Sequence, residues 1–398
     1  MELPLETKKI KLAILSISSL LMISMTASAI LGDIWLHFPD APESLIQMVL
    51  TLPALLGLIF AFAAGPASMR ISKKSLVIFS LSSGLIGGLM ALILGPLGLG
   101  FLLFASILIG VAQGFNATLS MALITDYFRG QERSAMMGLQ SAFLNGGSMV
   151  FLFTSGLLAN FKWNHAYLVY LAFLPILFIV IKNLPHDLPV KRSHSENLDH
   201  SQKLNASVYL MALFIFLFGS FFFVFQTNIA LLVVSKGYGD ATLSGMINTA
   251  LAASGMVTGI CYGKIKERLK IRTIPFGIAA VGLGMGLIYL VGSLPSLFVS
   301  AILVGFGISL VMPTGFYIAA NVVENRLQPT AIALLTAAVN LGMFVSPLLF
   351  NMINFQTAES TLLMKFIVSS IALFILAIAF VFGNRYILKM QRQQKSPL

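Results

Sequence analysis

Charged residues are scarce in this chain. Asp, Glu, Lys and Arg together make up 10% of its 398 residues, whereas soluble globular domains carry about 25%. This composition excludes an ordinary soluble domain. The single cysteine, Cys261, excludes an internal disulfide. Hydrophobic residues account for 58% of the chain, so we expect an integral membrane protein.

Charge is also missing from the interior of the apolar runs. A run of about 20 apolar residues crosses a hydrocarbon core of about 30 Å as a helix. The pattern predicts twelve such helices, at residues 12–31, 44–66, 75–95, 99–121, 135–159, 164–183, 206–235, 241–263, 273–292, 296–320, 330–354 and 360–384. The first run ends in Ala27-Ser28-Ala29, which also fits a signal-peptide cleavage site, but cleavage would leave the first half one helix short.

No Asp, Glu, Lys or Arg lies in the middle third of any predicted helix. Proton-coupled carriers often hold a carboxylate there, so proton coupling is not established by the sequence. The lack of a buried positive charge also argues against small anions such as nitrate or phosphate. The helices show no His-rich or paired-carboxylate cluster, which argues against an enzyme, and we expect neither a cofactor nor a metal site.

Basic residues are distributed unevenly. If the N-terminus is cytoplasmic, all but three of the 25 Lys and Arg lie on the cytoplasmic side, the exceptions being Lys162, Lys236 and Lys365. Basic residues favour that side of a cell membrane, so we expect both termini in the cytoplasm. Contact with anionic lipid explains the net charge of +11, and no nucleic-acid partner is needed.

The second half of the chain repeats the first. A polar stretch, residues 184–205, separates an N-terminal part, residues 1–183, from a C-terminal part, residues 206–398, and we expect it to be a cytoplasmic linker. Two nearly equal offsets align Gly57 with Gly255, Gly65 with Gly263, Arg70 with Arg268, Gly110 with Gly305, Asn145 with Asn340 and Gly147 with Gly342. An apolar chain with such a repeat is typical of a two-bundle transporter.

The loop after the second predicted helix carries the most specific motif. It reads GPASMRISKK from Gly65 to Lys74, and its counterpart from Gly263 to Arg272 reads GKIKERLKIR. Both resemble the pattern G-x-L-a-D-r-x-G-r-k, although the first copy has Met69 at the acidic position. With the repeat and the helix count, the chain resembles the major facilitator superfamily over about residues 8–388. The resemblance implies an all-α membrane fold of two pseudo-symmetric six-helix bundles.

The resemblance also implies a cytoplasmic latch between helices. In the family an acid near the inner end of the fourth helix, here Asp126, pairs with the loop arginine, here Arg70. Arg133 can share this acid, and Glu267 with Arg268 form the second-half counterpart. Such a pair holds two rigid bodies together until substrate or a proton weakens it. The alternative is an exposed pair worth less than about 1 kcal/mol.

Small residues recur at every fourth position on two helices. Gly57, Ala61 and Gly65 lie on the second helix, and Gly255, Gly259 and Gly263 lie on the eighth. Small faces allow close helix approach. The resemblance places these helices at the boundary between bundles, which makes their faces candidates for a sliding interface. Static packing inside one bundle predicts the same glycines.

Polar side chains within the apolar helices are candidates for a substrate cavity, because unpaired polar groups are costly in lipid. The candidates are Ser24, Thr26, Gln113, Asn116, Asn145, Gln226, Asn228, Thr314, Tyr317 and Asn340. A single such residue more often forms a hydrogen bond between packed helices than a contact with a ligand. Asp33, near the outer end of the first helix, is the candidate for proton coupling, and a hydrated acid at a helix end is the alternative reading.

These observations predict a monomeric transporter that moves a neutral or amphipathic small molecule by alternating access. Export is favoured over import because the loops and the tail contain no specialised domain. Uptake or facilitated diffusion of a sugar or another organic solute stays open. A membrane sensor or assembly partner that moves nothing is a further alternative.

Overall fold

The computed structural model describes residues 5–185, 204–323, 327–352 and 358–394, and all regular structure within them is helical. Twelve helices in these ranges are long and apolar enough to cross a membrane, which confirms the predicted number. The elements of the first half are α1 (Leu5–Ser19), η1 (Ile23–Thr26), α2 (Ala27–His37), α3 (Glu43–Ser68), α4 (Lys73–Ile93), η2 (Gly95–Leu97), α5 (Leu99–Tyr127), α6 (Gly130–Ala159), η3 (Trp163–Ala172) and α7 (Phe173–Asn183).

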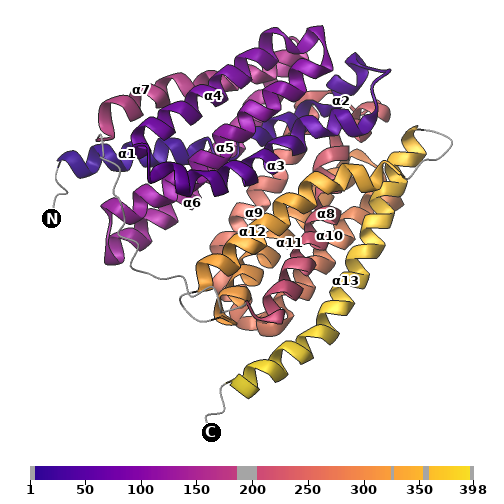
Figure 1. Ribbon diagram of the computed structural model, residues 1–398. Helices are drawn as coiled ribbons and strands as arrows, with labels where there is room; N and C mark the ends of the chain where they lie inside the picture. Colours follow the sequence, from indigo (N-terminus) through magenta and orange to yellow (C-terminus); the bar gives the residue numbers. More distant parts are fainter. Residues whose placement is uncertain (1–4, 186–203, 324–326, 353–357, 395–398) are drawn as a thin grey trace. The chain divides into compact units, whose positions relative to one another are not determined.

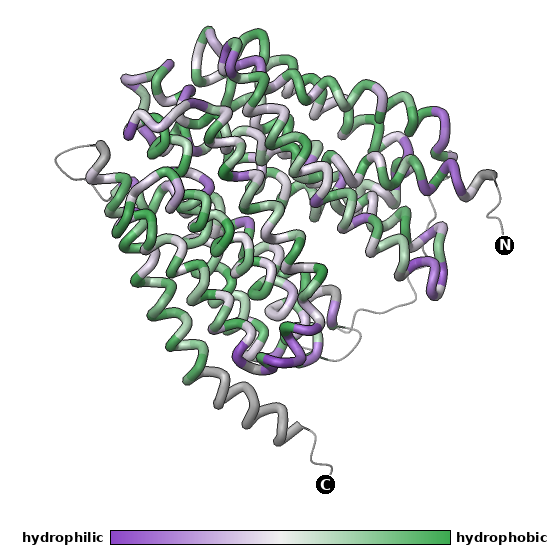
Figure 2. The backbone as a smooth tube through the Cα atoms, turned by 180° about the vertical axis from the view of Figure 1, so that it is seen from behind, coloured by the Kyte–Doolittle hydropathy of each residue, from purple (hydrophilic) through white to green (hydrophobic). Residues whose placement is uncertain are grey.

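The elements of the second half are α8 (Ala206–Ser235), α9 (Ala241–Leu269), η4 (Lys270–Arg272), α10 (Thr273–Leu290), α11 (Leu294–Asn321), α12 (Gln328–Phe350) and α13 (Ala358–Gln394) (Figure 1). Hydrophobic residues follow the helices, and hydrophilic ones gather near helix ends and connections (Figure 2). This distribution suits helices that satisfy their backbone groups internally and present apolar side chains to lipid.

The first predicted helix is broken rather than continuous. A turn at Leu20–Met22 separates α1 from the short 3₁₀ helix η1, which leads directly into α2. Two serine hydroxyls just before the break bond to backbone carbonyls of α1: Ser18 donates to Ile14 O and Ser19 donates to Ser16 O. Hydroxyls that bond locally to the backbone compete with regular helical pairing, which favours a break here.

The chain forms two compact units. One comprises residues 1–197 with 239–246, and the other comprises residues 198–238 with 247–398. The expected linker, residues 184–205, lies mostly outside the described residues. The short stretch 239–246, which contains the start of α9, belongs to the first unit, whereas the sequence pattern places it in the second half.

The same helix crossing occurs in each unit. In the first unit α3 packs against α5, where a Cβ on Gly110 would lie 2.6 Å from Leu56 Cβ. In the second unit a Cβ on the repeat-related Gly305 of α11 would overlap the carbonyl oxygen of Leu251 in α9. Only glycine permits backbones to approach this closely.

Candidate functional site

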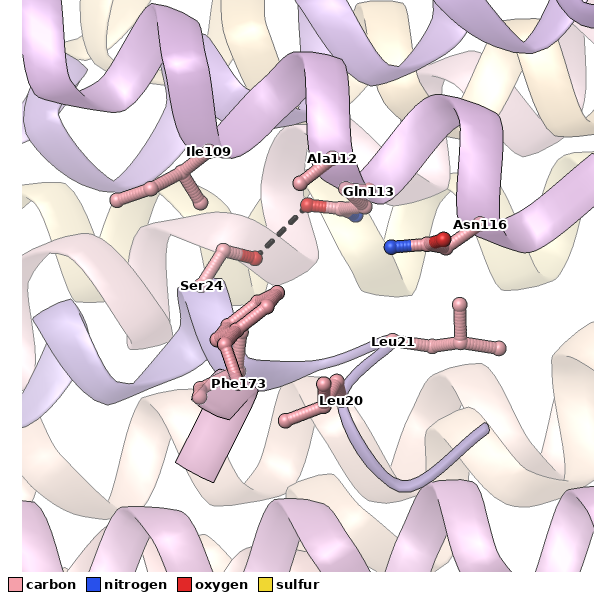
Figure 3. Close-up of a pocket in the computed structure, with 9 residues that line it drawn as sticks. Leu20, Leu21, Ser24, Ile109, Ala112, Gln113, Asn116 and Phe173 are labelled. Carbon is pink, nitrogen blue, oxygen red and sulfur yellow. Dashed lines mark hydrogen bonds between the residues drawn. The ribbon is translucent and has the colours of Figure 1, made fainter. Parts of the chain in front are cut away.

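A small cavity lies in the first unit beside the break in the first helix. Its volume is about 10 Å³, close to the space that one water molecule requires. The lining residues are Leu20, Leu21, Ile23, Ser24, Ile109, Ala112, Gln113, Asn116 and Phe173 (Figure 3). They come from the turn, η1, α5 and the first residue of α7. The helix break therefore exposes this part of the chain to α5.

Three predicted candidates meet in this cavity. Ser24 Oγ donates a hydrogen bond to Gln113 Oε1 at 2.9 Å. Asn116 lies one turn further along α5 and is 2% exposed, and its Oδ1 accepts a bond from Ser80 Oγ at 2.6 Å. Figure 3 shows its amide nitrogen turned toward the middle of the cavity, where no described residue accepts a bond from it. The cavity thus presents neutral hydrogen-bonding groups on an apolar wall.

Two further candidates in the first unit bond to their own helices. Thr26 is buried, and its hydroxyl donates to Ile23 O at 2.7 Å within η1. Asn145 is exposed on α6, and its amide nitrogen donates to Ser141 O at 2.9 Å. Both bonds lie within a single element, so they are neither contacts to a cavity nor the bonds between packed helices that were the alternative.

In the second unit, Gln226 and Asn228 lie buried on α8. Asn228 Nδ2 donates to Val224 O and to Thr227 Oγ1, both at 2.9 Å. Gln226 is 8% exposed, and its Oε1 is a buried acceptor for which no described residue supplies a donor. Unsatisfied buried acceptors are rare, so Gln226 is a candidate for contact with water or a ligand. Asn340, on α12, is half-buried.

Thr314 and Tyr317 on α11 contact two α9 residues, Tyr262 and Lys266, that are not among the predicted candidates. Tyr262 donates its phenol hydrogen to Thr314 Oγ1 at 2.9 Å, because the Thr314 hydrogen is directed to Leu310 O. The Lys266 ammonium lies 3.3 Å from the centre of the Tyr317 ring. The signal available in the sequence was the spacing of four between Tyr262 and Lys266, which places both on one helix face.

Asp33 lies half-buried on α2 beside a wider cavity of about 420 Å³. Its other lining residues are Leu36, His37, Ala159, Asn160, Trp163 and Asp240. Asp240 also caps the start of α9, since its Oδ1 accepts the Thr242 N–H at 2.9 Å. The His37 and Trp163 rings lie 5.3 Å apart. Asp33 therefore shares its cavity with a second carboxylate.

The residues predicted for the latch are arranged differently from the expected pairing. Asp126 forms an ion pair with Lys73, the first residue of α4, and both side chains are partly exposed. Arg70, the expected partner, is exposed, as are Arg133, Glu267 and Arg268. Lys73 belongs to the basic end of the loop motif, so the motif already contained the residue that pairs.

The predicted glycine faces divide into two groups. Gly57 packs against α5, where an added methyl group would lie 3.6 Å from Gln113 Cγ. Gly255 packs against α11, where an added methyl group would lie 3.0 Å from Ser309 Oγ. Nothing lies within 4 Å of the equivalent position on Gly65, Gly259 or Gly263. Gly57 and Gly255 thus make the contacts that packing inside one unit requires.

The charge count places Lys365 on the external side, although it falls within the predicted helix 360–384. In the structure it is 1% exposed and lies two turns into α13. Its ammonium donates to Asn351 Oδ1 at 2.6 Å. Asn351 caps the C-terminus of α12, and the negative end of a helix dipole stabilises a cation. The feature of the sequence that indicates this burial is a lysine within an apolar run.

Comparison with known proteins places the chain in a family. A sequence profile described as Major Facilitator Superfamily matches residues 12–347 and 213–396. No curated protein sequence matches the chain. The nucleoside transporter NupG has a TM-score of 0.74 at 15% identity, with 94% of this chain and 98% of NupG covered.

Two other solved structures are similar over nearly their full lengths. The POT family transporter PepTSo has a TM-score of 0.77 at 14% identity, with 100% of both chains covered. The xylose transporter XylE from E. coli, in an inward open conformation, has a TM-score of 0.72 at 12% identity, with 94% of this chain and 95% of XylE covered. At these identities the likeness concerns the fold.

Proposed function

The chain belongs to the Major Facilitator Superfamily, and we propose that it is a secondary active transporter that exports a neutral or amphipathic small molecule by alternating access. Members of this family are membrane transporters, so the chain is a transporter and not an enzyme. The substrate class, the direction and the coupling are the proposed part. Uptake or facilitated diffusion of a sugar or another organic solute is the competing function.

The cavity at the break in the first helix carries the proposal. Its polar groups are the Ser24 hydroxyl and the amides of Gln113 and Asn116, and no charged residue is among those that line it. Amides and hydroxyls bind uncharged hydroxyl or carbonyl groups well, whereas an ion in an apolar enclosure needs a counter-charge. The cavity has room for one such group, and the apolar wall suits the rest of an amphipathic solute.

The same chemistry supports export. A solute that fits an apolar wall with few polar contacts crosses a lipid bilayer without help, so an uptake carrier adds little to its entry. Active removal requires an energy source and a carrier. Asp33, half-buried on α2, is the group that we propose to carry a coupling proton.

The test begins with a thermal-shift screen of the purified protein against sugars, amino acids, organic acids and lipophilic compounds. For a solute that binds, Asn116→Leu removes the amide without changing side-chain size greatly. It should weaken binding about tenfold or more if the amide contacts the solute. The matched control is Asn145→Leu, because Asn145 is exposed and bonds only within α6. Equal affinity in Asn116→Leu and the wild type contradicts the proposed site.

Direction is measured with the same solute in inside-out membrane vesicles. Accumulation within energised vesicles corresponds to export from the cell. Accumulation only in right-side-out vesicles identifies uptake, and equilibration without accumulation identifies facilitated diffusion. Binding without any movement identifies a sensor.

A further inference from the structure

Lys266 lies against two tyrosine rings in the second unit. Its ammonium is 3.3 Å from the centre of the Tyr317 ring on α11 and 5.6 Å from the centre of the Tyr262 ring on α9. The predicted eighth helix ends at residue 263, but α9 continues to Leu269. This extension puts Lys266 one turn beyond Tyr262 on the same face, and so turns a loop lysine into a positioned one.

The surrounding hydrogen bonds hold this arrangement. Thr314 directs its hydroxyl hydrogen to Leu310 O at 2.7 Å, so its oxygen accepts from the Tyr262 phenol at 2.9 Å. The bond ties the Tyr262 ring to α11. A ring face attracts an ammonium but leaves its net charge uncancelled. The rings therefore position the Lys266 charge without neutralising it.

The Lys266 charge has no acidic partner among the described residues, unlike Lys73, which pairs with Asp126. An ammonium has three hydrogen-bond donors, and the ring contacts occupy none of them with an oxygen acceptor. Lys266 is half-buried, and Tyr317 is 55% exposed, so the cluster is accessible. Lys264 and Arg268 add positive charge nearby in sequence.

We propose that Lys266, Tyr262 and Tyr317 form a binding site for a single carboxylate or phosphate group on an amphipathic molecule. The ammonium binds the anionic group through charge-assisted hydrogen bonds, and the ring faces contact the apolar part of the same molecule. The transported solute is one source of such a group. In that case the site rests on the proposed function, and the solute is an amphipathic acid whose charge is balanced by Lys266 rather than by the uncharged groups of the cavity at Ser24. An anionic lipid headgroup offers the same chemistry.

The test uses the full-length protein in neutral detergent with octanoate as the probe and octanol as its uncharged counterpart. Calorimetry should show octanoate binding to the wild type, with affinity about tenfold or more lower in Lys266→Gln. Lys264→Gln, two residues away and exposed, is the matched control and should bind octanoate as the wild type does. Lys266→Arg retains the charge and should retain most of the affinity.

Two results overturn the site: equal octanoate affinity in Lys266→Gln and the wild type, or octanol binding as tightly as octanoate. Tyr317→Leu provides a second variant if Lys266→Gln does not fold, and it should also weaken octanoate binding. Nanodiscs separate the two sources of the anionic group. If discs containing phosphatidylglycerol lower the octanoate affinity of the wild type relative to discs of phosphatidylcholine alone, the headgroup occupies the site; if the affinities are equal, a soluble acid is the ligand.

Flux of a neutral solute identified in the thermal-shift screen is measured on the same preparations. If the wild type does not bind octanoate but still carries the neutral solute, this inference alone is refuted. Loss of all flux in every preparation refutes the proposed function, while octanoate binding can still be measured.

Discussion

At the residue scale, the polar side chains of the helices differ in where their hydrogen bonds go. Asn145 and Thr26 bond to backbone oxygens of their own elements, whereas Ser24 bonds to Gln113 on another helix. A bond within one helix satisfies a polar group wherever the helix packs. A bond between elements depends on how they meet, and so can change when a transporter changes conformation.

The buried pair of Lys365 and Asn351 leads to a stability prediction. Asn351→Leu removes an acceptor from a buried ammonium and should destabilise the protein by about 1–3 kcal/mol. Lys365→Met removes the charge together with its need for an acceptor, so it should cost less. Thermal unfolding in detergent shows which of the two variants is destabilised more. A larger loss in Lys365→Met than in Asn351→Leu contradicts this account.

Asp33 leads to a prediction about coupling. If its carboxyl carries the proton, Asp33→Asn should abolish accumulation driven by a pH gradient while exchange of solute at equal concentrations continues. Exchange needs the solute site but no net proton movement. Both are measured in proteoliposomes. Gradient-driven accumulation that survives in Asp33→Asn removes this residue from the coupling mechanism.

At the scale of elements, glycines determine which helices can approach closely. Gly147 on α6 lies against the Ser19 carbonyl at the end of α1. Its repeat partner Gly342, on α12, lies against α8, where an added Cβ would be 2.5 Å from Phe216 O. The repeat seen in the sequence is thus a repeat of helix contacts. Glycines at repeat-related positions therefore mark the equivalent close helix contacts in each unit.

The crossing of α9 and α11 gives a direct test. Gly305→Ala should destabilise the second unit by about 1–3 kcal/mol, because the added methyl overlaps the Leu251 carbonyl oxygen. Gly259→Ala, on α9, meets nothing within 4 Å and should be neutral or slightly stabilising, since alanine favours helix. Thermal unfolding of both variants checks the difference. Equal melting temperatures are inconsistent with a crossing this close.

The ion pair between α4 and α5 gives a second prediction at this scale. Lys73→Ala and Asp126→Asn should each cost less than about 1 kcal/mol, because both partners are partly exposed. The double variant should cost no more than the larger single change, since either change breaks the same pair. Arg70→Ala should leave stability unchanged. Coupling of Asp126 to Arg70 instead of Lys73 in a double-mutant cycle reverses the assignment.

At the scale of the whole molecule, the charge asymmetry predicts the orientation in the membrane. Both termini and residues 184–205 should be cytoplasmic, and residues 32–43 should be external. Cys261 is exposed, so it is first replaced by Ala. An impermeant thiol reagent applied to intact cells should then label Asp40→Cys and spare Ser195→Cys. Labelling of position 195 but not of position 40 would show that the orientation is the opposite of the predicted one.

The sequence by itself determined the number of membrane helices, the internal repeat and the family, and that the chain is a transporter. These properties depend on the length of apolar runs and on recurring positions along the chain, which need no knowledge of packing. It also selected Ser24, Gln113 and Asn116 as polar residues within apolar helices. The reason is that a polar group in lipid requires a partner whichever fold contains it.

Only the tertiary structure decided which of these groups meet. The break at Leu20–Met22 places Ser24 within hydrogen-bond distance of Gln113. The packing of α4 beside α5 pairs Asp126 with Lys73 rather than with Arg70. The extension of α9 places the Lys266 ammonium over the Tyr317 ring. The buried Lys365 donates a hydrogen bond to Asn351 at the end of α12. Each outcome depends on which face of a helix turns toward its neighbour, and a few residues of helix extension or a single break rotates that face.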